Sequence, residues 1–92
     1  MSLKQILFVL LMLSATSQAV TQLSPISVGS KTFTESYVLA EIMAQLLEAN
    51  GHEVSRRFGF GGTLIAFQAL RNGDIDVYPE YTGTISEVIL EL

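Results

Sequence analysis

The sequence contains no cysteine, a single histidine and no tryptophan among its 92 residues. Without cysteine the chain can form no disulfide, no thiolate metal site, no thiol nucleophile and no lipid-modified N-terminal cysteine. His52 stands alone, and one histidine without a second ligand is not a metal site, so we expect neither metal nor cofactor. Nine acidic residues against five lysines and arginines give a net charge of −4, which argues against nucleic acid as a partner.

The chain also lacks a long hydrophobic run. Residues 6–13 form an unbroken apolar stretch of only eight residues, whereas a membrane-spanning helix needs about 20. Lys4 precedes this stretch, and small or polar residues follow it, with Ser17 and Ala19 at the −3 and −1 positions of a cleavage site. This pattern is typical of a secretory signal peptide, and the alternatives are a buried helix or a membrane anchor. We therefore expect a signal peptide at 1–19, a mature chain at 20–92 and a periplasmic location.

Short apolar segments alternate with helical patterns along the rest of the chain. The expected strands are 26–29, 53–58 and 75–78, and a helix follows each. The order β-α-β-α-β-α predicts an α/β fold with a parallel sheet in three layers. In such sheets ligands bind beyond the carboxyl ends of the strands. The loops 29–34, 59–63 and 79–84 are therefore the expected site.

Local signals predict where the helices begin and end. The runs 32–35 and 84–87 fit capping boxes, and Thr63 can cap the middle helix. Asn-Gly pairs at 50–51 and 72–73 supply the left-handed stops. The first helix places its apolar residues on one face, which should be the buried one: Val38, Leu39, Ile42, Met43, Leu46 and Leu47.

The third helix runs to the last residue with no stop signal, and its sheet has only three strands. An open parallel sheet leaves unpaired edges, and a chain this short buries only about 60% of its surface. We expect residues 20–92 to be the N-terminal part of a longer lobe.

Two of the three loops carry candidate ligand contacts. Lys31, between a strand and a helix N-terminus, suits a carboxylate or phosphate, or it is a solvated loop lysine. The spacing of a P-loop is absent, so nucleotide binding is not expected. Tyr78 and Tyr81 can present ring faces to a cation, and Thr84 can donate to an anionic group. In the alternative interpretation Tyr78 is a core residue and Thr84 only a cap.

The remaining charged residues have structural interpretations. Arg56 and Arg57 are expected on a solvated strand face. Asp74 and Asp76 are expected to be solubilising or to pair with Arg71. No Ser-His-Asp arrangement, metal cluster or acid/base pair stands out, so the sequence gives no support for an enzyme.

Three segments together resemble the substrate-binding component of glycine betaine/choline ABC transporters. They are ISVGSKTFTE at 26–35, GFGGT at 59–63 and GDIDVYPEYTGT at 73–84, and Phe60 stands where the family often has leucine. The resemblance covers nearly all of residues 20–92. It implies lobe I of a type II periplasmic-binding-protein fold, a quaternary-ammonium ligand held between two lobes, and an ABC permease in the membrane as partner.

The resemblance also implies roles for individual residues. Tyr81 would be one wall of an aromatic cage around the trimethylammonium group. Lys31 and Thr84 would contact the oxygen-bearing end of the ligand, and Thr63 is a further candidate from its place after the glycine-rich loop. The alternatives are a non-functional truncated remnant of such a protein and a binding-protein-like lobe of a periplasmic enzyme.

Overall fold

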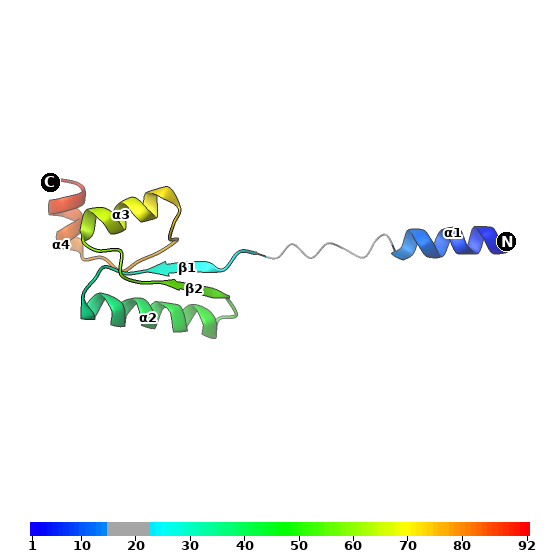
Figure 1. Ribbon diagram of the computed structural model, residues 1–92, viewed down its shortest axis with the longest axis horizontal. Coiled ribbons are helices and arrows are strands. Elements are labelled where there is room, and N and C mark those ends of the chain that lie inside the picture. The colour runs from blue at the N-terminus through cyan, green and yellow to red at the C-terminus, as the bar shows by residue number, and fades with distance from the viewer. Residues whose placement is uncertain (15–22) are drawn as a thin grey trace.

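The computed structural model describes residues 1–14 and 23–92 of the chain. After an N-terminal helix, β1, α2, β2 and α3 alternate along the chain, and the elements after α3 are helical (Figure 1). The elements are α1 (Leu3–Ser14), β1 (Ile26–Gly29), α2 (Thr34–Ala49), β2 (Val54–Arg57), α3 (Thr63–Asn72), α4 (Thr82–Thr84) and the π-helix η1 (Ile85–Ile89). In the described residues no helix combines the length and apolarity that crossing a membrane requires. The predicted cleavage site at Ser17 and Ala19 lies outside the described residues.

Within residues 1–14 and 23–92 the sheet is parallel, as predicted, but it has two strands. β1 pairs with β2 in the register Ile26↔Val54 to Gly29↔Arg57. Residues 75–78 do not form the expected third strand, and an isolated bridge joins Val77 to Val28. The side chain of Asp76 accepts the backbone N–H of Ser27 at 2.8 Å, and Pro79 has no N–H to donate. Both features limit the ladder that this segment can form with β1.

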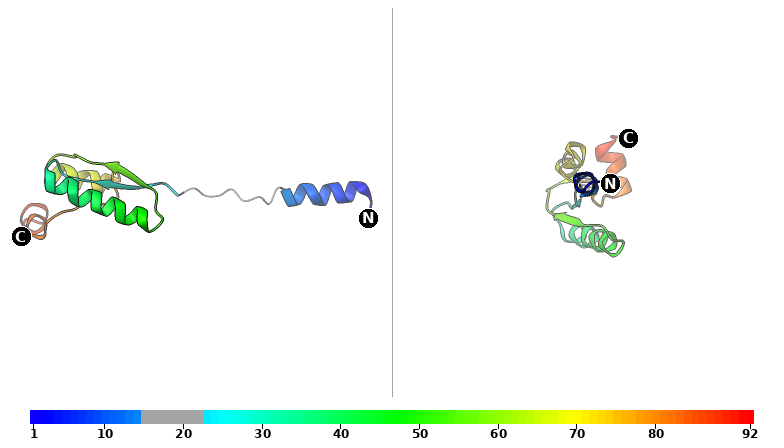
Figure 2. Two further views of the ribbon diagram at one scale, coloured as in Figure 1. Left: turned by 90° about the horizontal axis from the view of Figure 1, so that it is seen from below. Right: turned by 90° about the vertical axis from the view of Figure 1, so that its right-hand side faces the viewer.

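Helices cover both faces of the strands, which confirms the three-layer arrangement. α2 lies on one side, and α3 with the C-terminal helical segment lies on the other (Figures 1 and 2). Val28, Ala40 and Ala44 are fully buried between β1 and α2. Ile75, Ala66 and Ala69 form the buried set on the α3 side. Alanines at these contacts let the helices approach the short strands closely.

Only half of the apolar residues predicted to be buried on α2 are covered in the structure. Leu39, Met43 and Leu47 are half-buried on the side of the two alanines. The row Val38, Ile42 and Leu46 is instead 52–63% exposed. A two-stranded sheet is too narrow to cover the whole apolar face of a 16-residue helix.

The predicted left-handed residues at the C-termini of the helices are confirmed, whereas the predicted threonine caps at the N-termini are wrong. Gly51 and Gly73 have φ of +86° and +78°, in the left-handed region. None of the three threonine caps forms, since α2, α3 and α4 are preceded by Phe33, Gly62 and Tyr81 without side-chain cap hydrogen bonds. The hydroxyl of Thr32 accepts the N–H of Gly61 instead, and Thr84 lies inside the helical segment that its run was expected to begin.

Candidate functional site

The first two predicted loops are tied together at the carboxyl ends of β1 and β2. The buried hydroxyl of Ser30 accepts the N–H of Gly59 at 2.9 Å, and the carbonyl of Ser30 accepts that of Phe60. Thr32 exchanges two hydrogen bonds with Gly61, one from its N–H and one to its hydroxyl. Gly59 and Gly61 have φ of +85° and +87°, a conformation that side chains other than glycine rarely adopt. This glycine-rich turn holds the loop containing Lys31 in place.

Lys31 and Glu80 form a buried ion pair where the loops meet. The ammonium of Lys31 lies 2.7 Å from Oε1 of Glu80, and the two side chains are only 7% and 6% exposed. The ammonium also donates to the hydroxyl of Thr63 at 3.2 Å. Lys31 therefore joins the loop after β1 to the first turn of α3 and to the loop before α4.

Two aromatic rings lie beside this ion pair. The rings of Phe33 and Tyr81 are stacked, with centroids 6.4 Å apart and planes inclined by 27°. The ammonium of Lys31 is 5.4 Å from the Phe33 centroid and 5.7 Å from that of Tyr81. Both side chains stay about two-fifths exposed, so the rings are accessible from solvent.

The ring of Tyr81 is held from both ends. Its hydroxyl donates to the carboxylate of Glu35, in the first turn of α2. Its backbone N–H donates to Oε1 of Glu80 at 3.0 Å. The hydrogen bond to Glu35, followed by burial, raises the pKa of the Tyr81 hydroxyl. The phenol therefore stays neutral at physiological pH and keeps its donor.

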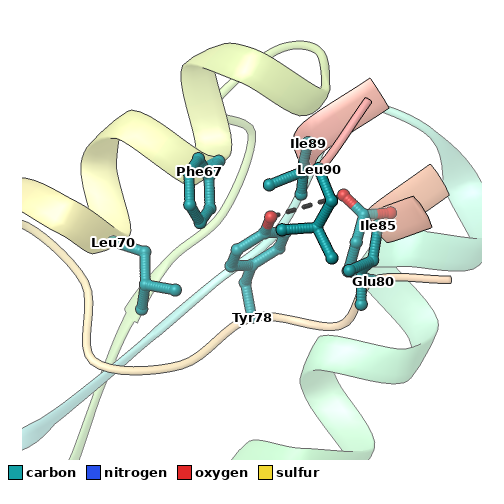
Figure 3. Close-up of a pocket in the computed structure, with 7 residues that line it drawn as sticks. All are labelled: Phe67, Leu70, Tyr78, Glu80, Ile85, Ile89 and Leu90. Atoms are coloured by element: carbon teal, nitrogen blue, oxygen red, sulfur yellow. Dashed lines mark hydrogen bonds between the residues drawn. The ribbon is translucent and has the colours of Figure 1, made fainter. Parts of the chain in front are cut away.

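Tyr78 lines an apolar hollow of about 290 Å³ between α3 and η1 (Figure 3). Its hydroxyl donates to Oε2 of Glu80 at 3.4 Å. Burial and the neighbouring Glu80 charge raise the pKa of Tyr78 to about 12. The other lining residues are Phe67, Leu70, Ile85, Ile89 and Leu90. Tyr78 thus belongs to the packing beneath the site, and it supports Glu80.

Of the four predicted contact residues, the structure brings three together. Lys31 and Thr63 are hydrogen-bonded, and the ring of Tyr81 lies over the same ammonium. Thr84 ends α4, one helical turn after Tyr81, and in the described part of the chain it has no hydrogen bond to this cluster.

Sequence reasoning missed Phe33, Glu35 and Glu80. In the sequence Phe33 stands out only as part of a helix start, and Glu35 only as half of a capping box. The available signal for Glu80 was its place between two tyrosines at the end of a strand segment.

Residues 24–91 match the family model described as the substrate-binding domain of the ABC-type glycine betaine transport system. The chain is 40% identical over 74 residues to the glycine betaine-binding protein YehZ of Escherichia coli K12, an alignment covering 80% of this chain and 24% of that protein. It is 46% identical over 61 residues to the ergothioneine transport permease/ergothioneine binding protein EgtU of Helicobacter pylori G27, covering 65% and 11%.

The structure of apo YehZ from E. coli superposes with a TM-score of 0.64 at 40% identity, over 67% of this chain and 22% of that one. The predicted α/β class is thereby confirmed. The chain spans about a quarter or less of the length of these relatives. With a family model matching most of its length, the chain belongs to the family of substrate-binding domains of ABC-type glycine betaine transport systems.

Proposed function

We propose that this chain acts in the extracytoplasmic capture of a quaternary-ammonium solute for an ABC importer, with a membrane permease as its partner. The observation that carries the proposal is the stacked pair of Phe33 and Tyr81 at the carboxyl edge of the strands. The solutes named for the two relatives, glycine betaine and ergothioneine, both carry a trimethylammonium group and a carboxylate. Accessible aromatic faces bind such a cation through the ring quadrupole.

Each site residue has a role in this proposal. Tyr81 is a wall for the methylated cation, and its tether to Glu35 fixes the ring before ligand arrives. Phe33 adds a second ring face beside it. Lys31, Thr63 and Thr84 are the candidate contacts for the oxygen-bearing end of the ligand. A site held in place by internal hydrogen bonds loses little conformational entropy on binding.

The contacts within this chain support only weak binding. One desolvated cation–π contact contributes about 2 kcal/mol, and one charge-assisted hydrogen bond contributes about 1.5–3 kcal/mol. Their sum of about 3.5–5 kcal/mol corresponds to a Kd near the millimolar range, whereas micromolar binding needs about 8.2 kcal/mol. We therefore expect the 92-residue chain to bind glycine betaine in the millimolar range.

Titration of the labelled chain with glycine betaine, followed by NMR, tests the proposal. The signals of Phe33 and Tyr81 should shift and saturate at millimolar ligand. Tyr81→Leu should abolish the shifts, and Tyr81→Phe, which keeps the ring face, should retain them. The control ligand is 3,3-dimethylbutanoate, which has the same shape and carboxylate but a neutral tert-butyl group. Equal binding of this neutral analogue, or no shift with glycine betaine, would contradict the proposal.

A further inference from the structure

One carboxylate connects the three loops of the site. Oε1 of Glu80 accepts the ammonium of Lys31 at 2.7 Å and the N–H of Tyr81 at 3.0 Å. Oε2 accepts the hydroxyl of Tyr78 at 3.4 Å, the contact drawn in Figure 3. Through Lys31 the network continues to the hydroxyl of Thr63. Glu80 thus contacts both the side chain of Lys31 and the backbone that carries the Tyr81 ring.

The ammonium of Lys31 is itself a cation beside the aromatic pair of Phe33 and Tyr81. It lies 5.4 and 5.7 Å from the two ring centroids, near the outer end of the range of about 6 Å within which a ring attracts a cation. The Lys31 side chain is 7% exposed, whereas both rings are about two-fifths exposed. The ammonium therefore lies on the inner side of the ring pair, and the outer ring surface is left to a ligand.

Two attractions compete for this ammonium. A buried ion pair at 2.7 Å is stronger than a cation–π contact near its distance limit, so the ammonium stays with Glu80. Without the charge of Glu80, a buried ammonium would keep the hydroxyl of Thr63 and the two rings as its partners among the described contacts. The carboxylate of Glu35, at the far end of the Tyr81 ring, would add to the attraction toward the rings. Lys31 would then move onto the surface that a ligand cation needs.

We propose that Glu80 is a positioning residue of this site, which holds the ammonium of Lys31 off the faces of Phe33 and Tyr81 and so keeps them open for the ligand cation. The inference rests on the proposed function, since it concerns access to the same aromatic pair. The position of Lys31 also preserves its role toward a ligand carboxylate. An ammonium has three N–H donors, and in the described part of the chain Glu80 and Thr63 accept two of them. The site thus offers a ring surface and a cationic donor together, the two features that a zwitterion requires.

Binding of tetramethylammonium to the 92-residue chain, followed by NMR titration, tests this role. This cation has no carboxylate, so it reports on access to the rings alone. Glu80→Gln keeps an oxygen that can accept from Tyr81 and Lys31 but removes the negative charge. We expect its Kd for tetramethylammonium to rise about three- to tenfold, because the released ammonium of Lys31 competes for the rings. Adding Lys31→Met should return the Kd to within about twofold of that of the unmodified chain.

A second measurement follows the position of Lys31 itself. The ring current shifts protons above an aromatic face upfield, so the ε-methylene signals of Lys31 should move upfield in Glu80→Gln. Phe33→Leu in that background should reduce the shift. A purely structural role for Glu80 would loosen the loops and move these signals the other way, toward those of the exposed Lys4. A through-space charge effect alone would raise the Kd and leave the Lys31 signals in place.

Glu53→Gln is the matched control. Glu53 precedes β2, at the opposite end of the strands from the site, and its side chain is exposed. The variant removes the same charge from the chain. It should change neither the Kd nor the Lys31 signals, which assigns both effects to the position of Glu80.

The outcomes separate the two proposals. An unchanged Kd in Glu80→Gln, or Lys31 signals that do not move upfield, would overturn the inference and leave the proposed function standing. Ring shifts with glycine betaine but none with tetramethylammonium in the unmodified chain would do the same, because the rings would not be open to a cation alone. No shift with either ligand would overturn the proposed function and the inference with it.

The unmodified chain decides if Glu80→Gln loses its dispersed spectrum. Saturation with tetramethylammonium should leave the ε-methylene signals of Lys31 apart from those of Lys4, because the ligand occupies ring surface that Lys31 does not use. Movement of the Lys31 signals to the Lys4 position would show that the ligand displaces Lys31 from Glu80, which contradicts the inference.

Discussion

Arg56 on β2 donates two parallel hydrogen bonds to the carboxylate of Glu41 on α2. Nε lies 2.8 Å from Oε2, and Nη2 lies 2.9 Å from Oε1. Nη2 of the same guanidinium also donates to Oε1 of Glu48 at 2.7 Å. Glu48 lies about two helical turns after Glu41 on the same face of α2. A planar guanidinium can serve two carboxylates at once, which a lysine cannot do with the same geometry. Arg56 therefore links strand to helix, and it does so from the exposed strand face on which it was expected.

The first prediction concerns the salt dependence of this link. Arg56→Gln should lower Tm by no more than a few degrees at low salt, because exposed ion pairs contribute little. The difference from the unmodified chain should shrink in 1 M NaCl, where the Debye length is about 3 Å. Thermal unfolding followed by circular dichroism measures both. Arg71→Gln, on the exposed end of α3, is the control, and a salt-independent loss in Arg56→Gln would contradict the electrostatic account.

The second prediction concerns acid. Hydrogen bonds from Arg56, then from Gln45, lower the pKa of Glu41 to about 2 from its usual 4.5. Because the folded-state pKa is depressed, this carboxylate stabilises the fold fully above about pH 4.5 and loses its contribution as pH falls toward 2. In denaturant unfolding, the difference between the unmodified chain and Glu41→Gln should be constant near neutrality and vanish near pH 2. A difference that persists unchanged at pH 2 would refute this assignment.

The third prediction concerns the contact between β1 and residue 75. A Cβ on Gly29 would lie 2.6 Å from Cδ1 of Ile75, which is 1% exposed. Gly29→Ala should therefore destabilise the chain by about 1–3 kcal/mol through overpacking. Ile75→Val removes the clashing Cδ1, so the double variant should lose less stability than the sum of the two single variants.

Gly83→Ala is the control for this pair, since a Cβ there meets nothing within 4 Å. It lies in α4, where alanine is favoured over glycine by up to about 1 kcal/mol. Urea unfolding should show no loss in this control. Strict additivity of Gly29→Ala and Ile75→Val would show that the predicted clash is absent.

Local features of the fold were predictable, and features that depend on distant partners were not. The stops at Gly51 and Gly73 depend only on a left-handed backbone after a helix, which sequence shows directly. The start signals failed because the hydroxyls of Thr32 and Thr63 bind groups 29 and 32 residues away. The expected third strand failed for the same reason, since Asp76 accepts from a backbone group 49 residues away.

The same division holds for the site. The rule that ligands bind beyond the carboxyl ends of parallel strands was enough to select the loops that contain Lys31 and Tyr81. In the structure these loops meet, and the ammonium of Lys31 lies 5.7 Å from the centroid of the Tyr81 ring. It gave no information on Glu80, whose main partner lies 49 residues earlier. The sequence therefore predicts that Lys31 and Tyr81 lie near each other. It does not predict that the ammonium of Lys31 forms an ion pair with Glu80.

The last prediction concerns alkaline pH. Burial and the charge of Glu80 raise the pKa of Tyr78 to about 12 from its usual 10. A raised folded-state pKa means that stability from this group is fully present below about pH 10 and is lost as pH rises toward 12. Because the pKa of the Tyr81 hydroxyl is raised as well, the titration is done in a Tyr81→Phe background. There Tyr78→Phe should remove the late step from an ultraviolet tyrosinate titration and flatten the fall in stability over that range. Tyr37→Phe, beside Phe58 on the opposite face of the strands, is the control and should leave the late step in place. A late step that survives Tyr78→Phe would show that the hydroxyl facing Glu80 is not the group that resists ionisation.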